Sequence, residues 1–242
     1  MSSSDQIVDH LRIVAAERAA RHDEPGLNEK VLAIKRYQQL RFRHTYADLL
    51  ESTRYGPAAH FFLEELYGPG DFSRRDGQFA RVVPTIVRLF PVEIVKTVAA
   101  LAELHSLSER LDTLMGRSLR QTPLDAAGYV EAWQAVSSSL ERKQQIDLTL
   151  GVARSLESLT QKTLLRNSLR LMRRPARAAG LGELQQVLEQ GFDTFKAMNG
   201  AREFIALVET RERHLAAALF GATSCDVGAA CQQDDLLRLL PS

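Results

Sequence analysis

Residues 60–84 read HFFLEELYGPGDFSRRDGQFARVVP and carry the clearest local signals in the chain. Gly68-Pro69-Gly70 ends a short aromatic helix, because glycine supports a left-handed cap and proline cannot continue the helix. Ser73 followed by Asp76 has the spacing of a capping box and predicts that a new helix starts at the next residue. Pro84 interrupts the hydrogen-bond ladder of that helix, so we expect a kink or break there. The stretch therefore predicts two helices joined by a turn.

Helical periodicity extends from this stretch in both directions. Alternating runs of β-branched and aromatic residues, which are typical of strands, are nearly absent. The expected helices cover residues 5–22, 27–52, 58–67, 74–84, 92–119, 124–142, 152–172, 184–198 and 201–220. Gly151 is expected to mark a bend, and Pro175 to stop a helix. The sequence therefore predicts an all-α fold, a single irregular bundle of about eight or nine helices.

The length and composition suit one helical domain. The chain has 242 residues, of which 45% are hydrophobic, enough to bury a sizeable core. We expect a single domain over residues 1–221, with a possible boundary between two subbundles near Thr122, and a flexible tail over residues 222–242. Both cysteines, Cys225 and Cys231, lie in this tail, and their spacing fits no standard zinc or redox motif.

The charge balance gives no global argument for a polyanionic partner. Lys and Arg number 31 against 30 Asp and Glu, a formal net charge of +1. The first 23 residues contain charges throughout and no apolar run typical of a signal peptide. No uncharged stretch approaches the length of a membrane span. We therefore expect a cytoplasmic protein without a membrane segment, and nucleic acid is not the expected partner.

The leading functional hypothesis is a non-catalytic binding or regulatory module, because the familiar catalytic motifs are absent. It would bind a protein or a small-molecule ligand through an aromatic and charged surface. The candidate residues are Tyr55, Phe61, Phe62, Tyr67, Asp71, Arg74, Arg75 and Asp76. The same residues also fit an ordinary corner between two helices, with Phe72 anchoring the loop. Exposed apolar stripes could also close a homodimer.

A second hypothesis is a metal- or haem-dependent enzyme, although no cofactor is predicted outright. His44 and Asp48, and likewise His60 and Glu64, lie four residues apart and would share a helix face. Two such pairs on consecutive helices could form a site of two histidines and two carboxylates. His105, on an otherwise apolar helix, could serve as a haem ligand. The alternative for each is a local contact without a metal or cofactor.

A third hypothesis is phosphate or nucleic-acid binding through Arg166 to Arg177. Arg166, Arg170 and Arg173 fall on one helix face and could contact phosphates. Interleaved aromatic residues for base stacking are missing. A solvated face with ion pairs to other helices explains the same pattern.

The pattern FFLxELYGPxDFxxRD, here Phe61 to Asp76, resembles a family of bacterial proteins without an established activity. A later stretch, Arg173 to Gln185, is similar to RxPARxxGLGxLQ in that family. Gly191-Phe192 and Gly200 to Phe204 continue the likeness, which covers roughly residues 40–215. The resemblance implies one continuous domain and brings no catalytic residue or cofactor.

Overall fold

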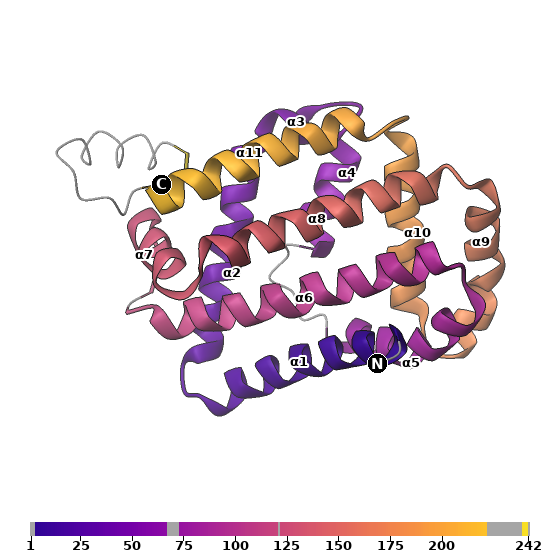
Figure 1. Cartoon of the computed structure of the whole chain (residues 1–242), viewed down its shortest axis with the longest axis horizontal. Coiled ribbons are helices and arrows are strands. Elements are labelled where there is room, and N and C mark those ends of the chain that lie inside the picture. Colours follow the sequence, from indigo (N-terminus) through magenta and orange to yellow (C-terminus); the bar gives the residue numbers. More distant parts are fainter. Residues whose placement is uncertain (1–2, 67–72, 121, 222–238, 242) are drawn as a thin grey trace.

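Four long helices lie side by side in one layer of the fold (Figure 1). They are α1 (Ser3–Asp23), α6 (Val92–Ser118), α8 (Ser139–Thr160) and α11 (Arg202–Gly221). Helix α6 contacts α1 on one side and α8 on the other, and α8 contacts α11. The structure is a computed structural model that describes residues 3–66, 73–120, 122–221 and 239–241.

Three helices cross behind this layer, namely α2 (Leu27–Thr45), α4 (Gly56–Phe61) and α10 (Gly182–Ala197) (Figure 1). A short helix, α3 (Ala47–Glu51), precedes α4, and a π-helical turn at Phe62–Leu66 follows it. Helices α5 (Ser73–Leu89) and α9 (Thr163–Ala178) lie at one end of the molecule, and α7 (Ala126–Val136) lies at the other. The described residues thus contain eleven α-helices and no strand, which confirms the all-α class and exceeds the expected helix number.

Apolar side chains fill the space between the layers in three clusters. The first joins α2, α4, α8, α10 and α11 around Leu63, Leu150 and Met198. The second, around Tyr129 and Trp133, joins α2, α6, α7 and α11. The third joins α1, α5 and α6. None of the helices in the described ranges is both long and apolar enough to span a membrane.

The helix expected over residues 124–142 is divided in two by a capping box. The Ser138 hydroxyl accepts from the Glu141 amide at 3.2 Å, and the Glu141 carboxylate accepts from the Ser138 amide at 3.0 Å. This reciprocal pair starts α8 and leaves α7 to end at Val136. The start of α7 is also set locally, because Asp125 accepts from the Gly128 amide at 2.8 Å.

The observed helices differ from the expected ones at further positions. The helix expected over 27–52 is broken at Tyr46, whose φ of −119° is not helical, so that α2 and α3 are separate. Pro84 and Pro175 are exposed residues inside α5 and α9, so the first does not break its helix and the second does not stop its helix. Helix α8 continues through Gly151 without the expected bend.

Part of the region expected to be a flexible tail is packed against the helices. Leu240 is 3% exposed and belongs to the cluster around Trp133. The Tyr37 hydroxyl donates to the carbonyl oxygen of Pro241 at 3.0 Å. Residues 239–241 are therefore part of the core, whereas residues 222–238, including both cysteines, lie outside the described residues.

Candidate functional site

The predicted surface aromatics belong to the core between α4, α10 and α11. Phe61 is 6% exposed, and a Cβ atom at Gly191 of α10 would stand 2.9 Å from its Cζ. The Phe62 ring lies 5.5 Å from that of Phe195 and 6.0 Å from that of Phe204, measured between centroids. These contacts place Phe61 inside the core and Phe62, which is partly buried, at its edge.

Tyr55 is held at the start of α11. Its hydroxyl donates to Glu203 at 2.6 Å, and its ring lies 5.7 Å from that of Phe204. The hydrogen bond to Glu203 raises the pKa of Tyr55. Arg54 binds the same carboxylate at 2.9 Å and the carbonyl oxygen of Met198 at 2.8 Å. This arrangement links the α3–α4 turn to the α10–α11 turn.

The charged residues of the predicted surface separate onto two sides of α5. Arg74, whose side chain is 78% exposed, lies 3.0 Å from Glu183 of α10. Asp76 points the other way and binds Arg18 at 2.7 Å and His105 at 2.9 Å. Arg75 is half-buried and also has a partner. Tyr67 and Asp71 lie outside the described residues. The described candidates therefore do not converge on one surface.

Asp76 is the outer member of a buried ion cluster between α1, α2, α5 and α6. The cluster comprises Arg18, Arg21, Lys35, Asp76, His105, Glu109 and Asp112. At its centre, Glu109 is bound by Arg21 at 2.6 Å and by Lys35 at 2.8 Å. Arg21 also donates to the Thr113 hydroxyl at 3.0 Å. The cluster thus ties three helices to α6.

The charges in this cluster compensate one another. Burial opposes ionisation of Glu109, but Lys35 and Arg21 outweigh it and lower the pKa of Glu109 to about 2. Burial raises the pKa of Asp112, a shift that Lys35 opposes and the Glu109 charge reinforces. Perturbed pKa values can mark an active site. Here the Glu109 side chain is 4% exposed and the Arg21 side chain 6%, so the central pair is closed to a substrate. The cluster fits a structural role.

The four residues of the expected metal site do not gather at one place. Because the chain breaks at Tyr46, His44 belongs to α2 whereas Asp48 belongs to α3. Both oxygens of Asp48 accept from Arg211, at 2.6 and 2.7 Å, and these hydrogen bonds lower the pKa of Asp48. His60 lies 3.9 Å from Glu64 on an exposed face. Within residues 3–66, 73–120, 122–221 and 239–241, no group of three or more His, Cys, Asp or Glu side chains is placed to hold a metal ion.

The histidine considered as a haem ligand has a protein partner. His105 Nε2 lies 2.9 Å from the Asp76 carboxylate. Its neighbour Ser106 hydrogen-bonds His10 at 2.8 Å. The His105 contact joins α6 to α5, and the Ser106 contact joins α6 to α1. The ring nitrogen of His105 that would bind a haem iron is the one that faces Asp76.

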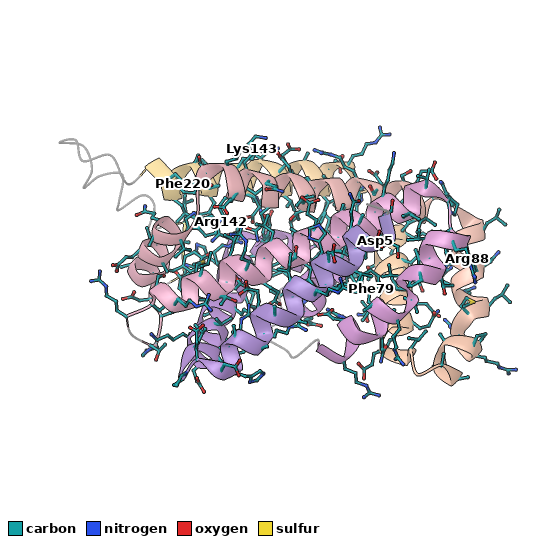
Figure 2. All side chains as sticks on the ribbon, turned by 60° about the horizontal axis from the view of Figure 1, so that its bottom comes forward. Asp5, Phe79, Arg88, Arg142, Lys143 and Phe220 are labelled. Carbon is teal, nitrogen blue, oxygen red and sulfur yellow. The ribbon has the colours of Figure 1, made fainter. Side chains whose placement is uncertain are left out.

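A buried arginine that sequence reasoning missed lies beneath α7. Arg142 is 1% exposed and sits inside the body, whereas the next residue, Lys143, lies at the outer edge (Figure 2). The Arg142 guanidinium stacks 3.6 Å above the Trp133 ring centroid and donates to Ser137 and Gln145 at 3.0 Å each. No carboxylate in the described part of the chain forms an ion pair with it, and burial lowers its pKa.

On α9, the arginines nearest to α10 are paired. Arg166 lies 2.6 Å from Asp193, and Arg173 donates through Nε to Glu189 at 2.7 Å. Arg170 lies beside Glu189 and contributes to the lowering of its pKa, after the Arg173 hydrogen bond. A small depression is lined by Arg166, Leu169, Arg170, Glu189, Phe192 and Asp193. The arginines that were expected to share one face of the helix therefore partly form ion pairs with α10 within the fold.

The opposite side of α9 is uncovered. Leu164 is 82% exposed, Leu171 79% and Met172 49%, whereas only Ala176 of this helix is buried among its described side chains. Sequence reasoning missed these leucines. The available signal was that the apolar residues of TLLRNSLRLM, residues 163–172, spread over almost half of the helix circumference, so that contact with one neighbour covers only some of them.

A family model described as a domain of unknown function, DUF8198, matches residues 17–225, which is most of the chain. The chain belongs to the DUF8198 family. The resemblance to an uncharacterised family is thereby confirmed. Comparison with curated proteins and with solved structures finds no match for the chain.

In this DUF8198 protein, two of the stretches that carry the resemblance meet in space. Gln78 of α5 is 3% exposed and accepts from the Leu184 amide at 3.1 Å, which caps the start of α10. Arg81 donates to the carbonyl oxygen of Gly180 at 3.3 Å. Together with the Phe61–Gly191 contact, these bonds make the junction of α4 and α5 with α10 a structural unit of the DUF8198 chain.

Proposed function

We propose that this DUF8198 protein is a non-catalytic binding module whose contact surface is the uncovered side of α9. The observation that carries the proposal is the exposure of Leu164 and Leu171, the two most exposed large hydrophobic side chains in the described residues. Exposed apolar residues that gather on one element are typical of interaction sites. Burying two leucines on binding would contribute roughly 1.5–3 kcal/mol each.

The charge of the same helix also supports a binding role. Residues 162–182 contain Lys162 and five arginines and no Asp or Glu. Two of these arginines are paired with α10, whereas Arg174 and Arg177 are exposed and form no ion pair within the described ranges. A local positive field attracts an anionic partner and speeds its association. The near-neutral net charge of the whole chain conceals this local excess.

The aromatic and charged segment from Tyr55 to Asp76 supports the same function indirectly. Its phenylalanines and Gln78 hold α10 in place, and α10 in turn carries α9. A rigid support of this kind keeps a contact helix oriented at low entropic cost on binding.

Site-specific photocrosslinking in the native host tests the proposal. A photoreactive phenylalanine analogue replaces Leu171 in one variant and Leu140 in a control variant. Leu140 lies on α8, away from α9, and is 72% exposed, so the side chains at the two probe positions have similar exposed fractions. We expect a discrete crosslinked adduct at position 171 and none of that mass at position 140. The same adducts at both positions, or none at 171, would contradict the proposal.

A further inference from the structure

We propose that the partner of α9 is an acidic amphipathic helix of another protein. It would lie along Leu164 and Leu171 and offer carboxylates to Arg174 and Arg177. This inference rests on the proposed function and specifies its partner. Helix α9 already binds one acidic helix, α10, and Arg174 and Arg177 remain exposed outside those ion pairs.

Helix α10 shows the mode of binding within the chain itself. Arg166 contacts Asp193 at 2.6 Å, and Arg173 contacts Glu189 at 2.7 Å. The earlier arginine meets the later acid, so the two helices run antiparallel. Leu169 and Phe192 lie between the two pairs in the same depression. An apolar contact flanked by arginine–carboxylate pairs therefore already joins α9 to an acidic helix.

The uncovered side of α9 repeats these elements. Leu164 and Leu171 lie seven residues apart, as do Arg170 and Arg177. At about 100° of rotation per residue, Arg174 lies about 70° from the leucine stripe, on the flank toward α10, and Arg177 lies farther round on that flank. Arg174 and Arg177 are exposed and have no ion-pair partner in the part of the chain that the structure describes. A second helix that lies on the two leucines and toward α10 would thus meet the guanidinium of Arg174 first and that of Arg177 beyond it.

Charge and geometry disfavour the other occupants. Two copies of α9 would bring Arg174 and Arg177 of each chain together, and neither arginine has an ion-pair partner among the described residues. A nucleic acid would satisfy the arginines but leave Leu164 and Leu171 in water, and the described side chains of α9 include no aromatic ring for base stacking. A bilayer-bound helix places its whole apolar side in lipid. Helix α9 instead packs against α10 and α8, and its Leu165 and Leu169 are half-buried, so part of its apolar side is not open to lipid. An acidic helix satisfies both the leucines and the arginines.

The test uses the full chain and a synthetic helical peptide. The fluorescein-labelled peptide carries leucines with heptad spacing and glutamates on one flank, and a matched peptide carries glutamine in place of each glutamate. Binding is measured by fluorescence anisotropy at low and high NaCl. We expect the glutamate peptide to bind, to weaken with salt, and to lose about ten-fold in affinity for an Arg174→Glu/Arg177→Glu variant. The glutamine peptide should bind the unaltered chain about ten-fold more weakly.

The control variant makes the same change of charge elsewhere. Arg43 and Arg202 are exposed on α2 and α11, and Arg43→Glu/Arg202→Glu should leave peptide binding unchanged. Circular dichroism confirms that both variants are folded. Absence of peptide binding, or an equal loss in the control variant, would overturn the inference.

The competing occupants are tested in parallel. Vesicles of phosphatidylcholine with phosphatidylserine and a single-stranded oligonucleotide are the two further probes. The inference of an acidic helical partner is overturned if the vesicles or the oligonucleotide bind, the Arg174→Glu/Arg177→Glu variant loses that binding, and the peptide does not bind. A crosslinked adduct at position 171 without peptide binding rejects this inference and leaves the proposed function standing. No adduct at that position rejects both.

Discussion

The ring of Phe61 lies directly against the backbone of Gly191, so that α4 approaches α10 at a point where no side chain intervenes. A Cβ atom at Gly191 would stand 2.9 Å from Cζ and 3.2 Å from Cε1 of that ring. Both distances are shorter than carbon atoms normally tolerate. The close approach of the two helices therefore depends on this glycine.

Replacing Gly191 by Ala should destabilise the protein by about 1–3 kcal/mol, because the added methyl group forces the Phe61 ring to move. Gly151→Ala is the matched control. That glycine also lies inside a helix, a Cβ atom added to it would meet no other atom within 4 Å, and alanine there should stabilise by up to about 1 kcal/mol. Urea unfolding followed by circular dichroism measures both. Phe61→Leu should restore part of the loss in the Gly191→Ala background.

Glu109→Gln should lower the free energy of unfolding at pH 7 by about 3 kcal/mol, because it leaves Arg21 and Lys35 buried without their carboxylate. The folded-state pKa of Glu109 is about 2, below its ordinary value of 4.5. Its contribution is therefore fully present above about pH 4.5 and is lost as the pH falls toward 2. The difference between the unaltered protein and the variant should shrink over that interval.

Urea titrations at pH 7, 4 and 2.5 would measure this difference. The control is Glu131→Gln, since Glu131 is 61% exposed and its one ion pair among the described residues is with the exposed Arg120 at 3.1 Å. That variant should stay within about 1 kcal/mol of the unaltered protein at each pH. A difference for Glu109→Gln that did not change with pH would contradict the assigned charge state.

Leu240→Ala should destabilise the fold by about 2–5 kcal/mol, because Leu240 is 3% exposed in the cluster around Trp133. Leu140→Ala removes the same atoms from a side chain that is 72% exposed, and it should change stability by less than about 0.5 kcal/mol. Thermal unfolding of the two variants provides the measurement. Equal melting temperatures would show that residues 239–241 are not part of the core.

Ser138→Ala should cost about 1 kcal/mol, because it removes one half of the capping box that starts α8. Ser139→Ala alters the next residue, whose hydroxyl forms no hydrogen bond among the described residues, and should be close to neutral. Chemical denaturation of the two variants is the measurement. A larger loss for Ser139→Ala than for Ser138→Ala would refute the assigned helix start.

The helices with a continuous apolar stripe could be predicted from the sequence. The helix expected over 92–119 is observed as Val92–Ser118, and the one expected over 201–220 as Arg202–Gly221. The missed breaks at Tyr46 and Ser138 depend on one backbone angle and one pair of hydrogen bonds. Pro175 shows the converse, since a proline with exposed surroundings is tolerated in the last turn of a helix.

The candidate sites were harder to predict than the helices. Arg21 and Glu109 are 88 residues apart and ordinary in their local sequence, so only the fold reveals their pairing. Phe61 and Phe62 looked suited to a pocket because their neighbours are charged, but burial depends on α10 and α11, which come far later in the chain. Leu164 and Leu171 show the same limit, since periodicity does not tell which part of a wide apolar sector a neighbour covers.

The pairing of α1 with α6 has a consequence for the growing chain. Arg21 of α1 finds its partner hydroxyl on Thr113, 92 residues later. At a synthesis rate of about 5–20 residues per second, the first helix waits roughly 5–18 s for that partner to be made. During this interval Ile7, Leu11 and Val14, which are buried in the finished fold, have no α6 to cover them. The nascent polypeptide therefore exposes these apolar side chains near its N-terminus, where a ribosome-associated chaperone would bind.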